Sequence, residues 1–410
     1  MRVPVRLIRL LMLPLLFACG GGGGEPDGGG GGPITVSGRV LSGVAPAPGL
    51  LIAIGGKTTR SDASGRFSIP DVAVPYDLIE VDPTGFGTGA VYQGLTRPDP
   101  TIAAFGTRLP LRSATVHGRM SGGEAIQDPG VSTVVGWGSP QSGPVTGAGQ
   151  DPYALEVDWT GPDAITGAVH ALQWRTDSQG VTTFTAHGAR QGVQVANGSD
   201  AGADLAMAPV NTSSIGGTWS FPADYHLYSL HLGVAFADGA LIEVPAGYAS
   251  PFTFPFPEIA DSSAKLEVRA QGPHGTLSDV ILSHIRPGTT DLNLQLRAAQ
   301  DLLSPDDGAG GVDTTTEFSW TPTDGGVTLF YVYGASNGPE YLVFTAGTKA
   351  RLPDLSGYGV ALPPGVHLLW NAIAFGPAAG VDALATGGTL LPDQDLVFDT
   401  ISPYRTFTTR

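Results

Sequence analysis

Glycine and proline set the main limit on what this chain can fold into. They account for 60 and 34 of its 410 residues, and they are spread between short apolar stretches along the whole chain. Charged residues make up only 14%, well below the usual share of about a quarter. Frequent turn formers and few charges favour short strands joined by tight turns. The composition therefore predicts an all-β protein.

The apolar residues have the spacing of strands. Ile34, Val36 and Val40 alternate with polar residues, as in a half-buried strand. The turn 62–65 opens with Asp and closes with Gly, which is typical of a hairpin. Repeated short strands with such turns predict tandem β-sandwich, immunoglobulin-like domains.

Changes in this pattern place the domain boundaries. We expect a signal peptide at 1–18, a Gly-rich tether at 19–32, and β-sandwich domains at 33–111, 112–210, 211–298 and 299–410. The mature chain is too long for one ordinary core. The stretch 116–120 repeats the pattern of 36–40, which favours a repeated unit. The pattern leaves open whether 112–298 forms one domain or two.

The N-terminus has the layout of a secretory signal. Arg2, Arg6 and Arg9 precede the apolar run 10–17, which is too short for a bilayer span of about 20 residues. The segment Leu16-Phe-Ala-Cys19 resembles a bacterial lipobox, although a small residue is more usual than Phe17. The resemblance implies cleavage before Cys19, the only cysteine, and its acylation, including palmitate.

A lone cysteine is more often a small buried residue or an unpaired thiol, but a Gly-rich segment in which no core can form follows Cys19. The lipobox therefore implies a bacterial lipoprotein, held on the membrane by its N-terminal lipid. In some Gram-negative bacteria Asp after the cysteine retains such proteins at the inner membrane. Gly20 occupies that position here, which implies the outer membrane of the cell envelope.

Two further segments resemble known domain families. Val36-Ser-Gly-Arg-Val40 and Ser61-Asp-Ala-Ser-Gly-Arg-Phe-Ser-Ile69 resemble the opening strand and hairpin of carboxypeptidase regulatory-like (transthyretin-like) domains. Thr316-Glu-Phe-Ser-Trp320 and Tyr404-Arg-Thr-Phe-Thr-Thr409 resemble strands of a fibronectin type III or immunoglobulin-like domain. The segment 382–399 departs from the latter pattern as an insertion before the final strand.

Charge and cysteine content narrow the possible partners. The chain has 37 acidic and 21 basic residues, a formal charge of −16. No basic stretch could neutralise phosphates, so we expect no nucleic acid partner. A single cysteine excludes disulfides and thiolate metal sites within the chain.

Apparent catalytic motifs lack the setting that their chemistry needs. Gly334-Ala-Ser-Asn-Gly338 matches G-x-S-x-G, but it lies between two strand-like runs, whereas a nucleophile elbow joins a strand to a helix. Gly55-Gly-Lys-Thr58 resembles the end of a phosphate loop, but Leu51 stands where that loop requires glycine. The glycines of 85–90 precede no helix. We therefore expect loops at these positions and no catalytic residues.

Metal and cofactor sites are not predicted either. The eight histidines are scattered and none forms H-E-x-x-H. Asp306, Asp307 and Asp313 cluster in a Gly-rich segment, but their spacing is not that of a calcium loop, and turn capping is the favoured interpretation.

The aromatic residues separate a core from candidate binding residues. Trp320 and Trp370 align with core positions, whereas Trp137 and Trp159 are candidates for exposed binding platforms. The segment 251–257 is predicted to be an edge strand or a domain linker. We therefore expect a non-catalytic envelope lipoprotein in a structural or adhesive role, whose partner is an envelope protein or a glycan. The alternatives are a carbohydrate-binding module and a hydrolase hidden in 112–298, which would need a pocket with converging His, Asp or Ser.

Overall fold

Nearly all regular elements of the protein are strands. The computed structural model describes residues 32–82, 87–105, 109–334, 338–388 and 394–410. Helical turns in this part of the chain are the short α1 (Val381–Leu384) and two 3-10 turns at Pro273–Gly275 and Ser356–Tyr358. None of the described helices is long and apolar enough to cross a membrane. The predicted all-β, tandem β-sandwich class is confirmed.

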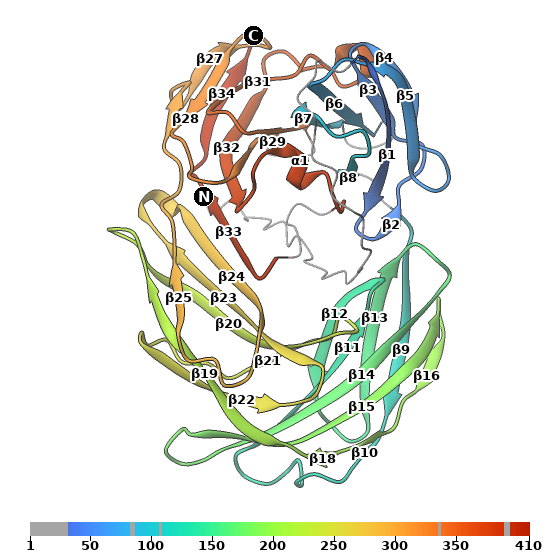
Figure 1. Cartoon of the computed structure of the whole chain (residues 1–410), viewed down its shortest axis with the longest axis vertical. Coiled ribbons are helices and arrows are strands. Elements are labelled where there is room, and N and C mark those ends of the chain that lie inside the picture. Colours follow the sequence, from blue (N-terminus) through green and yellow to red (C-terminus); the bar gives the residue numbers. More distant parts are fainter. Residues whose placement is uncertain (1–31, 83–86, 106–108, 335–337, 389–393) are drawn as a thin grey trace.

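The strands form four consecutive units (Figure 1). In the N-terminal unit, one sheet contains β1, β2, β5 and β8, and the other strands belong to a facing sheet. The strands are β1 (Ile34–Ser42), β2 (Ala45–Pro46), β3 (Leu51–Ile54), β4 (Lys57–Arg60), β5 (Arg66–Val72), β6 (Tyr76–Val81), β7 (Thr88–Leu95) and β8 (Thr101–Ala103). The turn 62–65 joins β4 to β5, and the Asp62 carboxylate accepts hydrogen bonds from the backbone N–H groups of Ser64 and Arg66. It is not the expected hairpin, because β4 pairs with β3 and β5 pairs with β1 in a different sheet.

The second unit is built mainly from one eight-stranded sheet, and β10 and β17 pair beside it. Its strands are β9 (Leu111–Gly118), β10 (Met120–Ser121), β11 (Val131–Ser139), β12 (Ser142–Ala148), β13 (Tyr153–Thr160), β14 (Ala164–Thr176), β15 (Thr182–Ala196), β16 (Asp200–Gly202), β17 (Leu205–Ala206) and β18 (Ala208–Pro209). Side chains from β9, β11, β13, β14 and β15 fill its core.

In the third unit, a sheet of β22, β19 and β25 faces β21, β20, β23 and β24. The strands are β19 (Asn211–Ser220), β20 (His226–Phe236), β21 (Leu241–Val244), β22 (Phe252–Glu258), β23 (Ser262–Gln271), β24 (Leu277–Ile285) and β25 (Leu292–Gln295). The proline-rich β22 lies at the edge of its sheet, as its sequence predicts.

The C-terminal unit places β26, β28 and β31 over a sheet centred on β29, β30 and β32. Its strands are β26 (Leu302–Ser304), β27 (Ala309–Val312), β28 (Glu317–Trp320), β29 (Val327–Gly334), β30 (Glu340–Thr345), β31 (Lys349–Arg351), β32 (His367–Gly376), β33 (Leu396–Ile401) and β34 (Arg405–Thr409). Trp320 and Trp370 are buried in its core, as expected.

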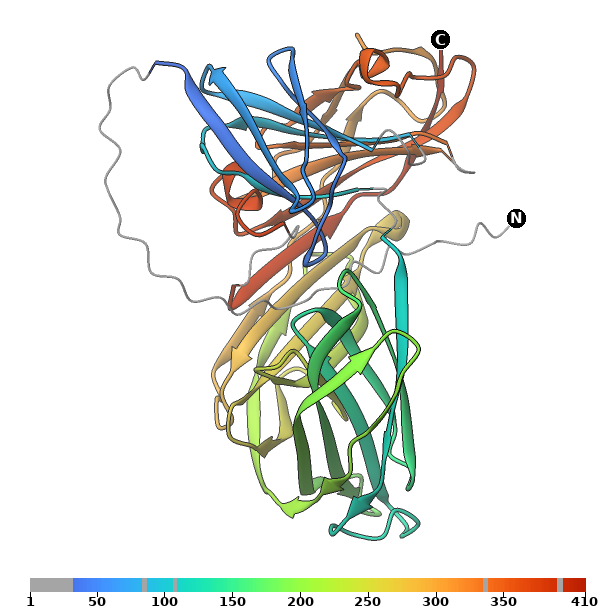
Figure 2. The ribbon, with the colours of Figure 1, turned by 90° about the vertical axis from the view of Figure 1, so that its right-hand side faces the viewer.

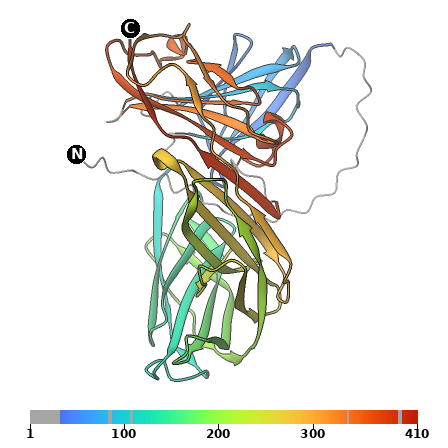
Figure 3. The ribbon, with the colours of Figure 1, turned by 90° about the vertical axis from the view of Figure 1, so that its left-hand side faces the viewer.

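One fourteen-stranded sheet runs through three of the four units, and we call it the shared sheet. The C-terminal β30 pairs in parallel with the N-terminal β7, and the C-terminal β33 pairs antiparallel with β24 of the third unit. Figures 2 and 3 show β33 in red leaving the upper half of the molecule and lying beside β24. The first and last units are therefore neighbours in space although nearly two hundred residues separate them in sequence.

Candidate functional site

The pairing of β7 with β30 creates a seam beside which two pockets lie. Both strands are almost entirely buried because the shared sheet is covered on both faces, by the N-terminal sheet on one side and by β26, β28 and β31 on the other. Asp382, at the start of α1, reinforces the seam. Its carboxylate accepts hydrogen bonds from the backbone N–H of Thr96 at 2.9 Å and of Arg97 at 3.3 Å.

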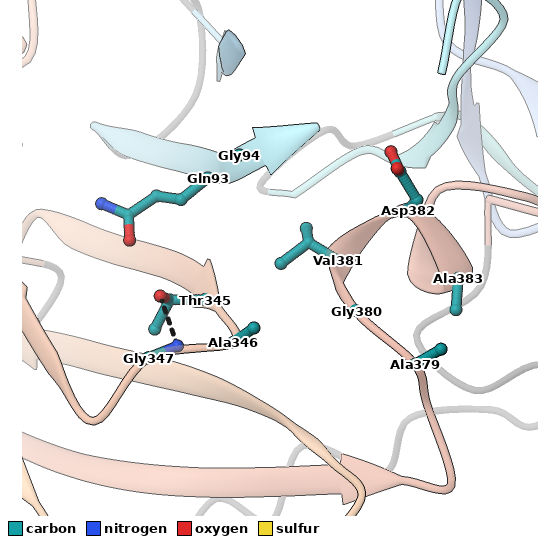
Figure 4. Close-up of a pocket in the computed structure, with 10 residues that line it drawn as sticks. All are labelled: Gln93, Gly94, Thr345, Ala346, Gly347, Ala379, Gly380, Val381, Asp382 and Ala383. Carbon is teal, nitrogen blue, oxygen red and sulfur yellow. Dashed lines mark hydrogen bonds between the residues drawn. The ribbon is translucent and has the colours of Figure 1, made fainter. Parts of the chain in front are cut away.

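A pocket of about 540 Å³ opens beside this seam (Figure 4). Gln93 and Thr345 line it from the ends of the two paired strands, and the segment 379–383 closes the opposite side. The hydroxyl of Thr345 accepts a hydrogen bond from the backbone N–H of Gly347 at 3.0 Å. The walls are mainly glycine, alanine and backbone. Such a pocket can hold a small polar group through the Gln93 amide, but its lining residues provide no acid–base pair.

A second pocket, of about 440 Å³, lies on the other side of Gln93. Its floor is apolar and includes Val91 and Val343, and its rim carries charges of both signs. Lys349 donates a hydrogen bond to Glu317 at 2.7 Å across this rim. Two of the rim charges are therefore paired with each other, and the lining shows no convergent catalytic group.

A hydrogen-bonded group of titratable residues lies between the second and third units. His170 on β14 contacts the Asp238 carboxylate through Nε2 at 2.7 Å, and its Nδ1 lies 3.1 Å from Nε2 of His187 on β15. Gln191 donates a second hydrogen bond to Asp238 at 3.1 Å. The ring of Phe236 stacks on His170, with 3.8 Å between the ring centroids. We call these residues the histidine cluster.

Burial sets the protonation of the histidine cluster. Burial and the neighbouring His170 lower the pKa of His187 to about 4, so this ring is neutral at pH 7. Burial alone would raise the pKa of Asp238, but the hydrogen bond from His170 brings that pKa below its ordinary value. The Asp238 carboxylate, the His170 ring and the neutral His187 ring thus form a hydrogen-bonded chain that fixes the orientation of the His170 ring.

A pair of aspartates lies where β24 meets β33. Asp279 and Asp399 are directly opposite each other in this pairing, and they share a hydrogen bond. Arg269 on β23 makes two hydrogen bonds of 2.6 Å to the Asp279 carboxylate. Burial and the charge of Asp279 raise the pKa of Asp399 well above its ordinary value. We call these residues the aspartate pair, which lies where the third unit joins the C-terminal unit.

The expectation that Trp137 is exposed is wrong. Trp137 lies in the middle of β11 with no exposed surface, and its indole N–H donates a hydrogen bond to Ser142 at 2.9 Å. The flanking glycines face the other way, toward the third unit. A Cβ at Gly138 would lie 2.0 Å from the backbone nitrogen of Ala240, and one at Gly136 would lie 2.9 Å from Ile242. The glycines are there to permit close packing and do not mark a loop.

Trp159 is buried as well, and the expectation of an exposed platform at this position is also wrong. It is 2% exposed on β13, and its indole N–H donates to the carbonyl of Pro162 at 2.8 Å. Both tryptophans belong to the core of the second unit.

Several expected features lie outside the described residues. These are Cys19, the signal peptide 1–18, nearly all of the tether 19–32, the central residues of the G-x-S-x-G match, and residues 85 and 86. The strands that flank that match, β29 and β30, pair as the predicted hairpin. Gly55 and Gly56 form a turn between β3 and β4. Asp313 accepts a hydrogen bond from the backbone N–H of Thr315, as a turn-capping carboxylate does. Asp307 differs from that expectation, because it accepts hydrogen bonds from Thr406 on the distant strand β34.

Sequence reasoning missed the histidine cluster and the aspartate pair. Their members come from β14, β15, β20 and the turn after it, β23, β24 and β33, so residues distant in the sequence are brought together. Within the described ranges, no three His, Cys, Asp or Glu side chains are arranged to hold a metal ion. A polar residue in an otherwise apolar strand, such as Asp399 or His170, is the one local signal that pointed to them.

Comparisons with known proteins add little to what the geometry of these residues indicates about function. No protein-family model and no curated protein matches the sequence. A tetra-tandem repeat from the extending region of a large adhesion protein shares 11% identity at a TM-score of 0.14, covering 83% of this chain and 95% of its own. The major pilin subunit BcpA of Bacillus cereus shares 10% identity at a TM-score of 0.13, covering 64% and 99%. Scores of this size carry no information on function.

Proposed function

We propose that this chain is a non-catalytic lipoprotein of the bacterial cell envelope, which presents one joined body of β-sandwiches for structural or adhesive contacts. The observation that supports the proposal is the shared sheet, because strand pairing at β7–β30 and β24–β33 ties three units into a single body. Such a body transmits force through ladders of backbone hydrogen bonds and does not depend on flexible linkers.

The N-terminal sequence supplies the anchor in this proposal. Cys19 carries the lipid, and the following Gly-rich segment of thirteen residues has a mean reach of roughly 20 Å as a flexible coil. The acidic charge of −16 offers no attraction to anionic headgroups, so the acyl chains make the membrane contact. Gly20 favours the outer membrane.

A hydrolase remains the weaker alternative. The histidine cluster does bring His and Asp together near the middle of the chain, but neither of the two pockets described above is lined by it. A glycan-binding role is the stronger alternative, and a tyrosine cluster described in the next subsection favours it.

Fractionation of cells tests the anchor. The wild-type protein is expected in the outer-membrane fraction and to incorporate an alkyne-labelled palmitate, whereas Cys19→Ser is expected to lose the label and remain uncleaved or leave the membrane. Gly20→Asp is the matched variant, because it keeps the cysteine and is expected to move the labelled protein to the inner membrane. Labelling of Cys19→Ser equal to that of the wild type would contradict the proposal.

A further inference from the structure

Three tyrosine rings gather on one face of the shared sheet in the C-terminal unit. Tyr331 and Tyr333 of β29 stack with 5.0 Å between their ring centroids, and Tyr404 meets Tyr333 edge-on at 5.7 Å. Exposure rises across the cluster, from 8% for Tyr331 to 46% for Tyr404. The rings therefore form a half-open aromatic surface that reaches solvent at Tyr404.

Two polar side chains lie within this tyrosine cluster. Glu340 is directly opposite Tyr333 in the β29–β30 pairing, and Asn371 is directly opposite Tyr331 in the β29–β32 pairing. Directly opposite residues of antiparallel strands project from the same face of a sheet. Asn371 therefore projects from the same face of the sheet as Tyr331.

The Asn371 side chain has no hydrogen-bond partner. It is fully buried, and both its amide oxygen and its amide nitrogen lack a partner in the protein. A buried polar group without a partner costs about 1–3 kcal/mol, so natural proteins retain few of them. A buried amide without a protein partner beside an aromatic ring can instead be satisfied by a ligand.

Glu340 provides the acceptor that complements this amide. The residue is half-buried, and burial raises the pKa of its carboxyl, while Tyr331 donates a hydrogen bond to it. The carboxyl keeps further acceptor capacity after that single bond. The cluster therefore combines flat apolar rings with one acceptor-rich group and one group that both donates and accepts.

We propose that the tyrosine cluster is a binding site for neutral oligosaccharides, a proposal that rests on the adhesive role proposed above. A pyranose ring has an apolar face of C–H bonds that suits a tyrosine ring, and a rim of hydroxyls that both donate and accept hydrogen bonds. Tyr333 and Tyr404 would bind the faces, and Glu340 and Asn371 would bind the hydroxyls. Rigid aromatic anchors with a few placed polar groups are the usual composition of such sites.

Charge argues against acidic sugars as the ligand, and hydrogen bonding argues against proline-rich peptides. Acidic sugars would meet Glu340 in a protein whose net charge is −16, and like charges repel. Proline-rich peptides also pack on tyrosines, but proline lacks a backbone N–H and would leave the Glu340 acceptor without a donor. Neutral sugar hydroxyls satisfy both the ring faces and the two polar groups.

Isothermal titration calorimetry of the full-length lipoprotein in detergent tests the proposal. The probes are cellopentaose, maltoheptaose and chitopentaose, with polygalacturonate and a proline-rich decapeptide as competing ligands. We expect millimolar or tighter binding of at least one neutral probe. Tyr404→Ala and Glu340→Gln should each weaken that binding tenfold or more, while their thermal melts stay within a few degrees of the wild type.

Tyr248→Ala is the matched control, because Tyr248 is 69% exposed but lies in the third unit, away from the cluster. Its affinity should equal that of the wild type. Absence of binding to all neutral probes, preference for the peptide or the acidic polymer, or equal losses for Tyr404→Ala and Tyr248→Ala would each overturn the proposal. None of these outcomes bears on the lipid anchor, which the fractionation of Cys19→Ser tests separately.

Discussion

The third unit meets its two neighbours in different ways. It joins the C-terminal unit edge to edge, through the pairing of β24 with β33, and it joins the second unit face to face, through packing of Phe236, Ala240 and Ile242 against β11 and β14. Each contact buries titratable groups. The aspartate pair at the edge needs a proton to be stable, whereas the histidine cluster at the face needs His187 to be without one.

The stabilities of the two contacts therefore depend on pH in opposite directions. A group whose pKa is raised on folding stabilises the protein at low pH, and a base whose pKa is lowered on folding stabilises it at high pH. The two contacts are therefore expected to fail at opposite ends of the pH scale, and single substitutions can separate them.

Arg269→Met is expected to have the largest effect. It removes the cation that faces the buried Asp279, and breaking a buried ion pair on one side typically costs about 3–5 kcal/mol. Urea denaturation at pH 7 measures the loss. Adding Asp279→Asn and Asp399→Asn to Arg269→Met should restore most of the stability, because no buried carboxylate is then left. A triple variant as unstable as the single one would contradict this account of the edge contact.

Gly138→Ala should weaken the face contact by about 1–3 kcal/mol, the usual cost of forcing extra atoms into a packed core. The added Cβ would lie 2.0 Å from the backbone nitrogen of Ala240, and a backbone atom cannot move aside as a side chain can. Thermal melting measures the effect. Gly202→Ala on β16 is the control, because open space surrounds that position, and its melting temperature should stay near that of the wild type.

Asp399→Asn should stabilise the protein by an amount that grows with pH. Because burial and Asp279 raise the pKa of Asp399, the wild type loses stability as pH rises from 3.8 through that raised pKa. Asparagine removes this dependence and retains a hydrogen-bond donor for Asp279. Denaturation midpoints at pH 4, 6 and 8 should show a widening gain for the variant. A gain in stability that is the same at all three pH values would contradict a raised pKa of Asp399.

His187→Gln should have the opposite pH signature. The pKa of His187 is lowered from 6.5 to about 4, so the wild type loses stability as pH falls through this window. Glutamine retains a donor toward His170 and does not titrate. The difference in denaturation midpoint between variant and wild type should therefore shift in favour of the variant between pH 7 and pH 4. His226→Gln, at an exposed position on β20, should leave the pH profile unchanged.

Asp382→Ala should have the smallest effect, about 1 kcal/mol, a typical net value for hydrogen bonds at a half-exposed site. It removes the carboxylate that supports the β7–β30 seam but leaves the strand pairing in place. Hydrogen exchange of the amides of Thr96 and Arg97 should accelerate, while exchange in β24 stays unchanged. Faster exchange throughout the shared sheet would mean that Asp382 does more than support one seam.

Local features of this fold could be predicted from the sequence. The alternation at 34–40, the Asp62 turn, the edge strand at 251–257 and the buried Trp320 all follow from residues close together in the chain. Periodicity and turn chemistry act over a few residues, and the sequence carries them directly.

Features that join distant segments could not be predicted in the same way. Nothing near β7 indicates that β30 will be its partner, although its run of buried residues on both faces is typical of a central strand. The burial of Trp137 could not be predicted, because the surface that Gly136 and Gly138 accommodate lies about a hundred residues further along the chain. The polar clusters have the same origin, since each combines residues from separate strands.

The parallel pairing of β7 with β30 also sets the order of folding. About 250 residues separate the two strands in sequence, and loop closure over such a distance makes pairing slow. During synthesis the edge of β7 in the N-terminal sandwich stays unpaired until the C-terminal part of the chain, with β30, has left the ribosome. An unpaired strand edge can pair with the wrong strand or with another chain. The yield of folded protein therefore depends on keeping the edge of β7 covered until β30 has been synthesised.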